Sequence, residues 1–157
     1  MILSLFAAMI IAFKEAMNVL PNIHPVALLL LLAAERYGYK ALMPTYVFVL
    51  VEFVIYGFGI WWITYLYAWA LWVLLVIALR RFSHPLLWTI VAGIFGFVFG
   101  ILDTIPYFII SGPAGGFTYL IHSIPFNLYH MFGNMAMVGL LYVPLRKALD
   151  IADRIHV

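Results

Sequence analysis

The stretch WWITYLYAWALWVLLVIALRR, residues 61–81, decides the fold class. It carries no charged side chain until Arg80 and Arg81 close it. An uncharged apolar run of roughly 20 residues has the length that a helix needs to cross the hydrocarbon core of a membrane. Because lysine and arginine collect in the cytoplasmic connections of membrane proteins, the arginine pair marks the cytoplasmic end of this predicted helix.

The whole chain repeats this pattern. Its 157 residues are 68% hydrophobic and 9% charged, whereas a soluble domain is roughly half apolar and a quarter charged. Seven of the eight lysines and arginines lie in short breaks between apolar runs: Arg36 and Lys40, Arg80 and Arg81, and Arg146, Lys147 and Arg154. The composition predicts an integral membrane protein, and the formal charge of +2 does not indicate nucleic-acid binding.

The runs between these breaks predict an all-α integral membrane protein, a six-transmembrane-helix bundle that forms a single domain over residues 1–157. The predicted spans are about 2–20, 24–37, 41–57, 61–80, 85–110 and 124–149. The second is short for a span and is therefore predicted to be tilted or partly interfacial. Because basic breaks follow every second span, both termini are predicted to be cytoplasmic. The glycine-rich stretch 111–123 is predicted to be an outer loop, either a lid or a plain connector.

Ionisable side chains at membrane depth are candidates for function because their burial in lipid is costly. Lys14, Glu15, Glu52 and Asp103 all lie in the outer third of their predicted spans, three acids against one base. One interpretation is that Lys14 pairs with Glu52 or Asp103 in a buried ion pair that only fixes helix register. The other is a binding site, because such pairing leaves carboxylates that need a ligand, a proton or hydrogen-bond donors.

The last predicted span carries three polar residues on one helical face, Asn127, His130 and Asn134. In a lipid-bathed helix such a face must point into the bundle. It then serves either for hydrogen bonds between helices or as the lining of a pocket at the depth of the acids.

Aromatic residues form a stripe along the fourth predicted span that includes Trp61 and Tyr65. An interfacial belt covers about one helical turn, and this stripe continues inward to Trp69 and Trp72, which indicates a wall that stacks on a flat ligand. Tyr107 on the fifth span could add to this wall. On the same span Pro106 frees the carbonyl of Leu102, next to Asp103, and broken backbone at this depth usually lines a cavity.

The sequence lacks the motifs that are typical of several function classes. The sequence contains no Gly-x-Ser-x-Gly or His-Glu-x-x-His motif, and its histidines are not placed as a haem pair. We therefore expect no enzyme, no catalytic residue, no metal and no cofactor. The inner half of the predicted bundle is too apolar for a channel. The remaining prediction is an outward-facing, closed-bottom binding pocket.

Three local motifs and the topology resemble the S components of energy-coupling factor (ECF) vitamin transporters. The motifs are Ala8-x-x-x-Ala12, Leu20-Pro-Asn-Ile-His-Pro25 and Phe126-Asn-Leu-Tyr-His130-Met-Phe-Gly-Asn134. The resemblance covers nearly the whole length. One departure is Asn127, where many members have Asp.

The resemblance implies a substrate-binding membrane subunit in the bacterial cell membrane. Such a subunit binds a vitamin near the outer surface and topples when it docks on a transmembrane scaffold subunit with two ABC ATPases. Ala8 and Ala12 would form the docking surface. The predicted substrate-binding residues are Lys14, Glu52, Trp61, Tyr65, Asp103, Tyr107, Asn127, His130 and Asn134.

The substrate prediction is a small flat heterocycle, such as a vitamin B6 form or a thiamine precursor. Riboflavin, a purine-like queuosine precursor and cobalamin stay open as alternatives. A different class also stays open, a ligand-free structural or assembly subunit of a larger membrane complex, in which the polar cluster only holds helices together.

Overall fold

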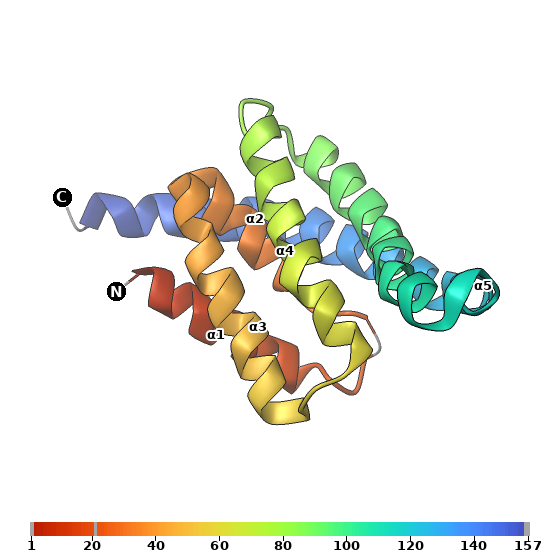
Figure 1. Cartoon of the computed structure of the whole chain (residues 1–157). Coiled ribbons are helices and arrows are strands. Elements are labelled where there is room, and N and C mark those ends of the chain that lie inside the picture. Colours follow the sequence, from red (N-terminus) through yellow and green to blue (C-terminus); the bar gives the residue numbers. More distant parts are fainter. Residues whose placement is uncertain (1, 21, 156–157) are drawn as a thin grey trace.

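The computed structural model describes residues 2–20 and 22–155, and every regular element in these ranges is a helix. The predicted all-α class is therefore confirmed. The elements are α1 (Ile2–Ala16), α2 (Val26–Tyr37), the short 3-10 helix η1 (Gly38–Ala41), α3 (Leu42–Tyr56), α4 (Ile60–Leu79) and α5 (Pro85–Ile155) (Figure 1). The first four predicted spans correspond to α1, α2, α3 and α4.

Helix α2 forms the centre of the molecule. Residues 26–34 are each at most 2% exposed, and α2 packs against α1, α4, α5 and η1. A helix that is apolar on every face is stable only when other elements surround it. The second predicted span is thus a short helix enclosed by its neighbours, and its tilt relative to a membrane stays a prediction.

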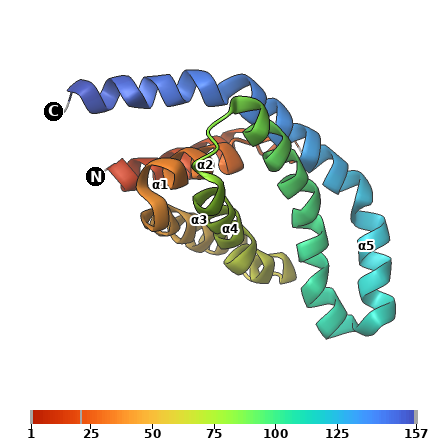
Figure 2. The ribbon, with the colours of Figure 1, turned by 90° about the horizontal axis from the view of Figure 1, so that it is seen from above.

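Helix α5 contains a sharp break that the sequence-based boundaries misplaced. Gly112 has φ 69° and ψ −177°, which is not helical, and the chain folds back there as a helical hairpin (Figure 2). The stretch 111–123, predicted to be a loop or lid, is helical on both sides of Gly112. One glycine suffices for the turn because it tolerates positive φ, and Pro113 suits the first turn of the helix that follows.

By length and composition, three helical segments could cross a membrane: Val26–Tyr56, Ile60–Leu79 and Pro85–Arg154. Helix α1 has 15 residues and α2 has 12, which at 1.5 Å per residue are shorter than the roughly 30 Å of a hydrocarbon core. The structure therefore does not support the predicted count of six spans or the predicted sidedness of the termini. It does show apolar helices that are compatible with a membrane protein.

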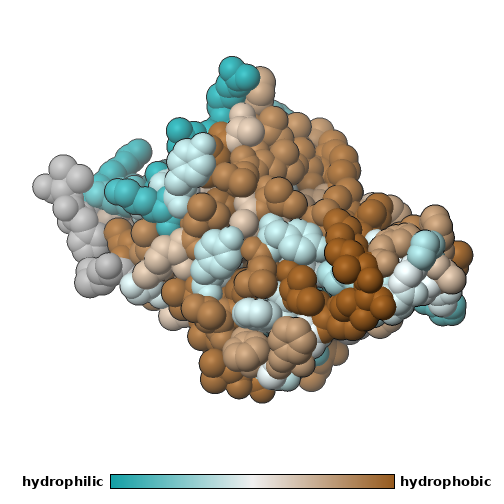
Figure 3. Space-filling model, viewed as in Figure 1, coloured by the Kyte–Doolittle hydropathy of each residue, from teal (hydrophilic) through white to brown (hydrophobic). Residues whose placement is uncertain are grey.

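The surface has a broad apolar band, and the basic breaks meet at one end. Figure 3 shows apolar residues over most of the visible face, with hydrophilic residues at its left and top. Arg36 pairs with Asp150, and Arg146 donates a hydrogen bond to the carbonyl of Ser83. The start of α1 and the end of α5 lie on the same side of the molecule in both ribbon views (Figures 1 and 2).

Candidate functional site

The main cavity has a volume of about 360 Å³ and lies between the α1–α2 connection, α4 and both arms of α5, which are the helical segments before and after Gly112. Four of the nine predicted substrate-binding residues, Tyr65, Asp103, Asn127 and His130, belong to its lining. The full lining comprises Asn22, His24, Tyr65, Trp69, Phe99, Gly100, Asp103, Tyr119, His122, Ser123, Phe126, Asn127 and His130.

Aromatic rings form one wall of this cavity. Tyr65 and Trp69 lie four residues apart, which places them on the same face of α4, and Phe99 faces them from α5. The ring centroids of Trp69 and Phe99 are 5.0 Å apart, and those of Tyr65 and Phe99 are 5.8 Å apart. The predicted stripe on the fourth span thus contributes Tyr65 and Trp69 to the lining. Trp72 packs deeper, with its ring stacked on Phe95 at 4.6 Å.

Asp103 is the acidic residue of the lining, and neighbouring hydroxyl groups hold its carboxylate. Thr64 donates a hydrogen bond to Oδ1 at 2.6 Å, and Tyr119 donates one to Oδ2. Tyr107 does not line the cavity but stacks on Tyr119 at 3.7 Å between ring centroids. Each carboxylate oxygen can accept further bonds, so Asp103 is oriented by the protein and can still bind a ligand donor.

A side chain provides the hydrogen bond that a buried proline withholds from the backbone carbonyl next to Asp103. Pro106 lies inside α5 and cannot donate to the carbonyl of Leu102. The Tyr67 hydroxyl donates to this carbonyl at 2.7 Å instead. Because an unpaired buried carbonyl would be costly, this bond ties α4 to α5 at the depth of Asp103.

Three histidines line the cavity, and the sequence-based site contained only His130. Two of them, His24 and His130, lie side by side. His24 lies in the connection before α2, and its ring centroid is 5.8 Å from that of His130 on α5. Within the described ranges, neither His24 Nδ1 nor His130 Nε2 has a hydrogen-bond partner. Helical periodicity cannot assign a face to a residue in a connection, so the sequence signal for His24 was only its place in the motif Leu20-Pro-Asn-Ile-His-Pro25.

His24 is expected to be uncharged at neutral pH. Burial, reinforced by the positive charge of Lys14, lowers the pKa of His24 to about 4 from 6.5. The unfolded chain therefore binds a proton at higher pH than the folded protein does, and the stability contributed by neutral His24 is lost as the pH falls.

We accordingly predict that the melting temperature of the purified protein falls between pH 6.5 and pH 4 because the unfolded state takes up the proton first. His24→Gln should flatten this part of the pH profile, since glutamine does not titrate. Thermal melts in detergent across that range measure the effect. An unchanged slope in the variant would show that other titrating groups govern the profile.

The predicted polar face of the last span points inward, as expected. Asn127, His130 and Asn134 are 3%, 5% and 1% exposed. Asn127 Nδ2 donates to Ser123 Oγ at 3.2 Å, next to the cavity. Asn134 Nδ2 donates to the carbonyl of Ala92 at 3.1 Å and does not line the cavity. Asn134 therefore ties the two arms of α5 together.

Lys14, Glu52 and Trp61 line a second hollow of about 210 Å³ instead of the main cavity. Lys14 Nζ lies 2.7 Å from Glu52 and 2.9 Å from Glu15, so the predicted ion pair forms with Glu52 and not with Asp103. The predicted single site is thus two hollows, and Tyr65 lines both.

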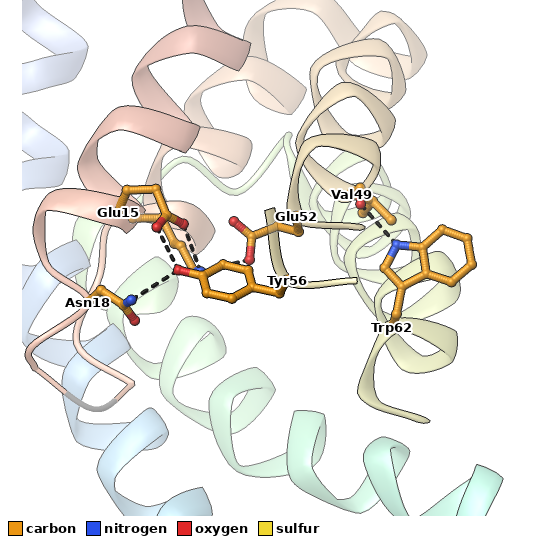
Figure 4. Close-up of polar contacts among 7 residues, drawn as sticks. Glu15, Asn18, Val49, Glu52, Tyr56 and Trp62 are labelled. Carbon is orange, nitrogen blue, oxygen red and sulfur yellow. Dashed lines mark hydrogen bonds and ion pairs between the residues drawn. The ribbon is translucent and has the colours of Figure 1, made fainter. Parts of the chain in front are cut away.

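Hydrogen bonds from α3 complete the cluster around Lys14. The Tyr56 hydroxyl donates to Glu15 at 2.6 Å and accepts a bond from Asn18 (Figure 4). Nearby, Trp62 Nε1 donates to the carbonyl of Val49 at 2.9 Å, which fixes the start of α4 against α3. Glu15 and Glu52 thus provide two carboxyl groups against the single cation of Lys14.

The docking residues proposed from the resemblance lie on the outside of α1. Ala8 and Ala12 are both exposed, and Ala16 continues the same row. Small residues in such a row let another helix approach closely in lipid. Their exposure leaves the row free for a partner.

The arrangement combines an aromatic wall, one carboxylate, three imidazoles and amide groups around one cavity. It can bind and orient a small ligand, and no three metal-ligating side chains come together among the described residues. No protein-family model matches the chain, no curated protein matches its sequence, and no solved structure matches its fold.

Proposed function

We propose that this protein is a membrane-embedded substrate-binding subunit for ATP-driven uptake of a small water-soluble vitamin or vitamin precursor. The main cavity is the observation that carries the proposal. Ligand sites are typically 300–1,000 Å³ and combine apolar walls with a few polar groups that fix orientation. At about 360 Å³ the cavity suits a ligand of one or two rings.

The size of the cavity narrows the substrate alternatives. A flat heterocycle such as a vitamin B6 form or a thiamine precursor fits between Tyr65, Trp69 and Phe99, whose rings can stack on it. Cobalamin is several times larger than the space and is no longer favoured. Riboflavin would fill the cavity tightly because it has three fused rings and a side chain.

The transport mechanism in this proposal follows from the resemblance to ECF S components. The chain supplies substrate specificity, and a scaffold subunit with two ABC ATPases supplies energy. We also propose that the chain crosses the bacterial cell membrane six times and has both termini in the cytoplasm. The gathering of Arg36, Arg80 and Arg146 at one end supports it, because basic residues mark the cytoplasmic side.

One observation favours the competing function of a ligand-free structural subunit. The cluster of Lys14, Glu15 and Glu52 is largely satisfied within the protein, as expected for polar groups that only hold helices together. In that cluster only Glu52 Oε1 lacks a partner among the described residues, whereas three lining residues of the main cavity, His24, Trp69 and His130, carry such atoms. This difference favours the binding function over the structural one.

Native mass spectrometry of the protein purified from cells grown in rich medium tests the proposal. We expect a co-purifying small molecule that is lost in Asp103→Asn, while Glu52→Gln retains it because Glu52 lies outside the main cavity. A protein without any co-purified molecule, and without a thermal shift against a vitamin panel, would favour the structural subunit.

The docking surface yields a separate prediction. Ala8→Leu combined with Ala12→Leu should abolish uptake and co-purification with the scaffold subunit, since large side chains prevent close helix approach. Ligand affinity of the isolated subunit should stay unchanged, because both residues are exposed on α1 and outside the cavity. Pull-down and binding assays measure the two effects. Ile2→Ala, also exposed on α1, is the control, and full uptake by the double variant would place docking elsewhere.

A further inference from the structure

We propose that the main cavity selects a flat heteroaromatic ligand that carries both hydrogen-bond donors and acceptors but no acid group. His24, Trp69 and His130 are its specificity-determining residues, and Asp103 excludes anions. This inference rests on the proposed function, because it defines the ligand of that same site.

Unpartnered polar atoms are concentrated in the lining of this cavity. Within residues 2–20 and 22–155, five buried side-chain nitrogen or oxygen atoms lack a hydrogen-bond partner. Three of them, His24 Nδ1, Trp69 Nε1 and His130 Nε2, belong to lining residues. A buried polar atom without a partner costs roughly 1–3 kcal/mol. A ligand that supplies hydrogen-bond partners for the three atoms removes this cost, and the free energy gained contributes to its binding.

The chemistry of these atoms defines what the ligand must present. An indole nitrogen is only a donor, so Trp69 requires an acceptor on the ligand. A neutral imidazole has one donor and one acceptor nitrogen, so the histidine pair can bind a donor–acceptor edge. Asp103 accepts only, and requires an N–H or O–H group. Aminopyrimidines and hydroxypyridines carry such groups around one flat ring.

The charge of the lining excludes acidic ligands. The described lining contains no lysine or arginine, and Asp103 is its carboxylate. Lys14 lies around the neighbouring hollow and is already paired with Glu15 and Glu52. The basic groups of the lining are the imidazoles of His24, His122 and His130. A phosphate or carboxylate in the main cavity would therefore lose its hydration, gain no lysine or arginine partner and face the charge of Asp103. Neutral and protonated ligands avoid this cost.

The aromatic residues favour a flat ring in the same space. Phe99 contacts the rings of both Trp69 and His130, at centroid distances of 5.0 Å and 5.1 Å. A ligand ring that packs against Phe99 thus lies beside the unpartnered nitrogens of its two neighbours. Stacking and hydrogen bonding can then act on one small heterocycle.

Matched ligand pairs that differ by an acid group test the inference. We would measure binding to the full chain in nanodiscs by calorimetry, with pyridoxine against pyridoxine 5′-phosphate, thiamine against thiamine monophosphate, and nicotinamide against nicotinic acid. The acid-free member of at least one pair should bind about 100-fold more tightly than its acidic partner, a difference of about 2.7 kcal/mol. Equal or tighter binding of the acidic member overturns the inference and leaves the proposed function intact. No binding in any pair, together with no co-purifying molecule, overturns both.

Variants test the individual residues. His24→Phe and His130→Phe keep an aromatic ring and remove the nitrogens, so each should weaken binding of the preferred ligand about tenfold, or 1.4 kcal/mol. A merely structural role predicts equal or higher thermal stability with unchanged affinity, since an unpaired buried atom is removed. Asp103→Asn should weaken binding of the acid-free ligand more than that of its acidic partner, so that the discrimination between them falls. His84→Phe, in the exposed connection before α5, is the matched control. Affinities of both histidine variants equal to that of the control would overturn their assignment.

Discussion

Lys14→Met is expected to lower the free energy of unfolding by about 3 kcal/mol or more, because removal of one partner leaves a buried charge without compensation. Glu52 is 1% exposed, and one of its oxygens, Oε1, already lacks a hydrogen-bond partner within the described ranges. Its other oxygen lies 2.7 Å from Lys14 Nζ. Without Lys14 the carboxylate must take up a proton or draw water into the contact between α1 and α3.

A double variant shows whether the loss comes from the unpaired charge. Lys14→Met with Glu52→Leu should recover most of the stability, because apolar side chains of similar size often replace a buried ion pair without loss. Unfolding of all variants in mixed detergent, followed by tryptophan fluorescence, measures the cycle. Arg36→Met is the control, since Arg36 pairs with the half-exposed Asp150 and Asp153 and such pairs contribute about 1 kcal/mol or less. A Lys14→Met effect no larger than that of the control would contradict the prediction.

Gly96→Ala should destabilise the protein by about 1–3 kcal/mol, the usual cost of an extra group in a packed interior. A Cβ atom at Gly96 would lie 2.6 Å from the backbone carbonyl oxygen of His130 and 2.9 Å from Asn134 Nδ2. The second arm of α5 must then move away, because a backbone carbonyl cannot rotate aside as a flexible side chain can. Ligand binding should be lost as well, since His130 moves with that arm.

Gly139→Ala is the matched control on the same pair of α5 arms. A Cβ atom there would lie 3.4 Å from Thr89 Cγ2, an ordinary contact. The alanine should be neutral or stabilising by up to about 1 kcal/mol through helix propensity. Thermal melts and calorimetry of both variants decide the outcome. Equal effects of the two alanines would mean that close approach at Gly96 does not hold the arms together.

The apolar patterning predicted the helices well because burial in a membrane or a core selects the same residues. The first four predicted spans match α1 to α4. The inward orientation of Asn127, His130 and Asn134 followed from their spacing, and the structure confirms it. Periodicity could not show that 111–123 is helical, because glycine and proline usually mark a loop and here only Gly112 departs from helical geometry.

The candidate site was only partly predictable for a different reason. Position along a helix is readable from sequence, and it grouped Lys14, Glu52 and Asp103, which line two hollows that share Tyr65. Sequence does not show the rotation of each helix about its axis or the path of a connection. Tyr65 separates two hollows, so Lys14 and Glu52 lie apart from the main cavity, and His24 enters it from a connection.

The sequence by itself determined the helical class, the apolar segments and the polar residues that had to face inward, because these follow from local periodicity and the cost of burying charge. Only the tertiary structure decided that Lys14 pairs with Glu52, that α5 folds back at Gly112, and that His24 meets His130 beside Asp103. Such contacts join residues up to 106 positions apart. They depend on how helices pack, which no local pattern encodes.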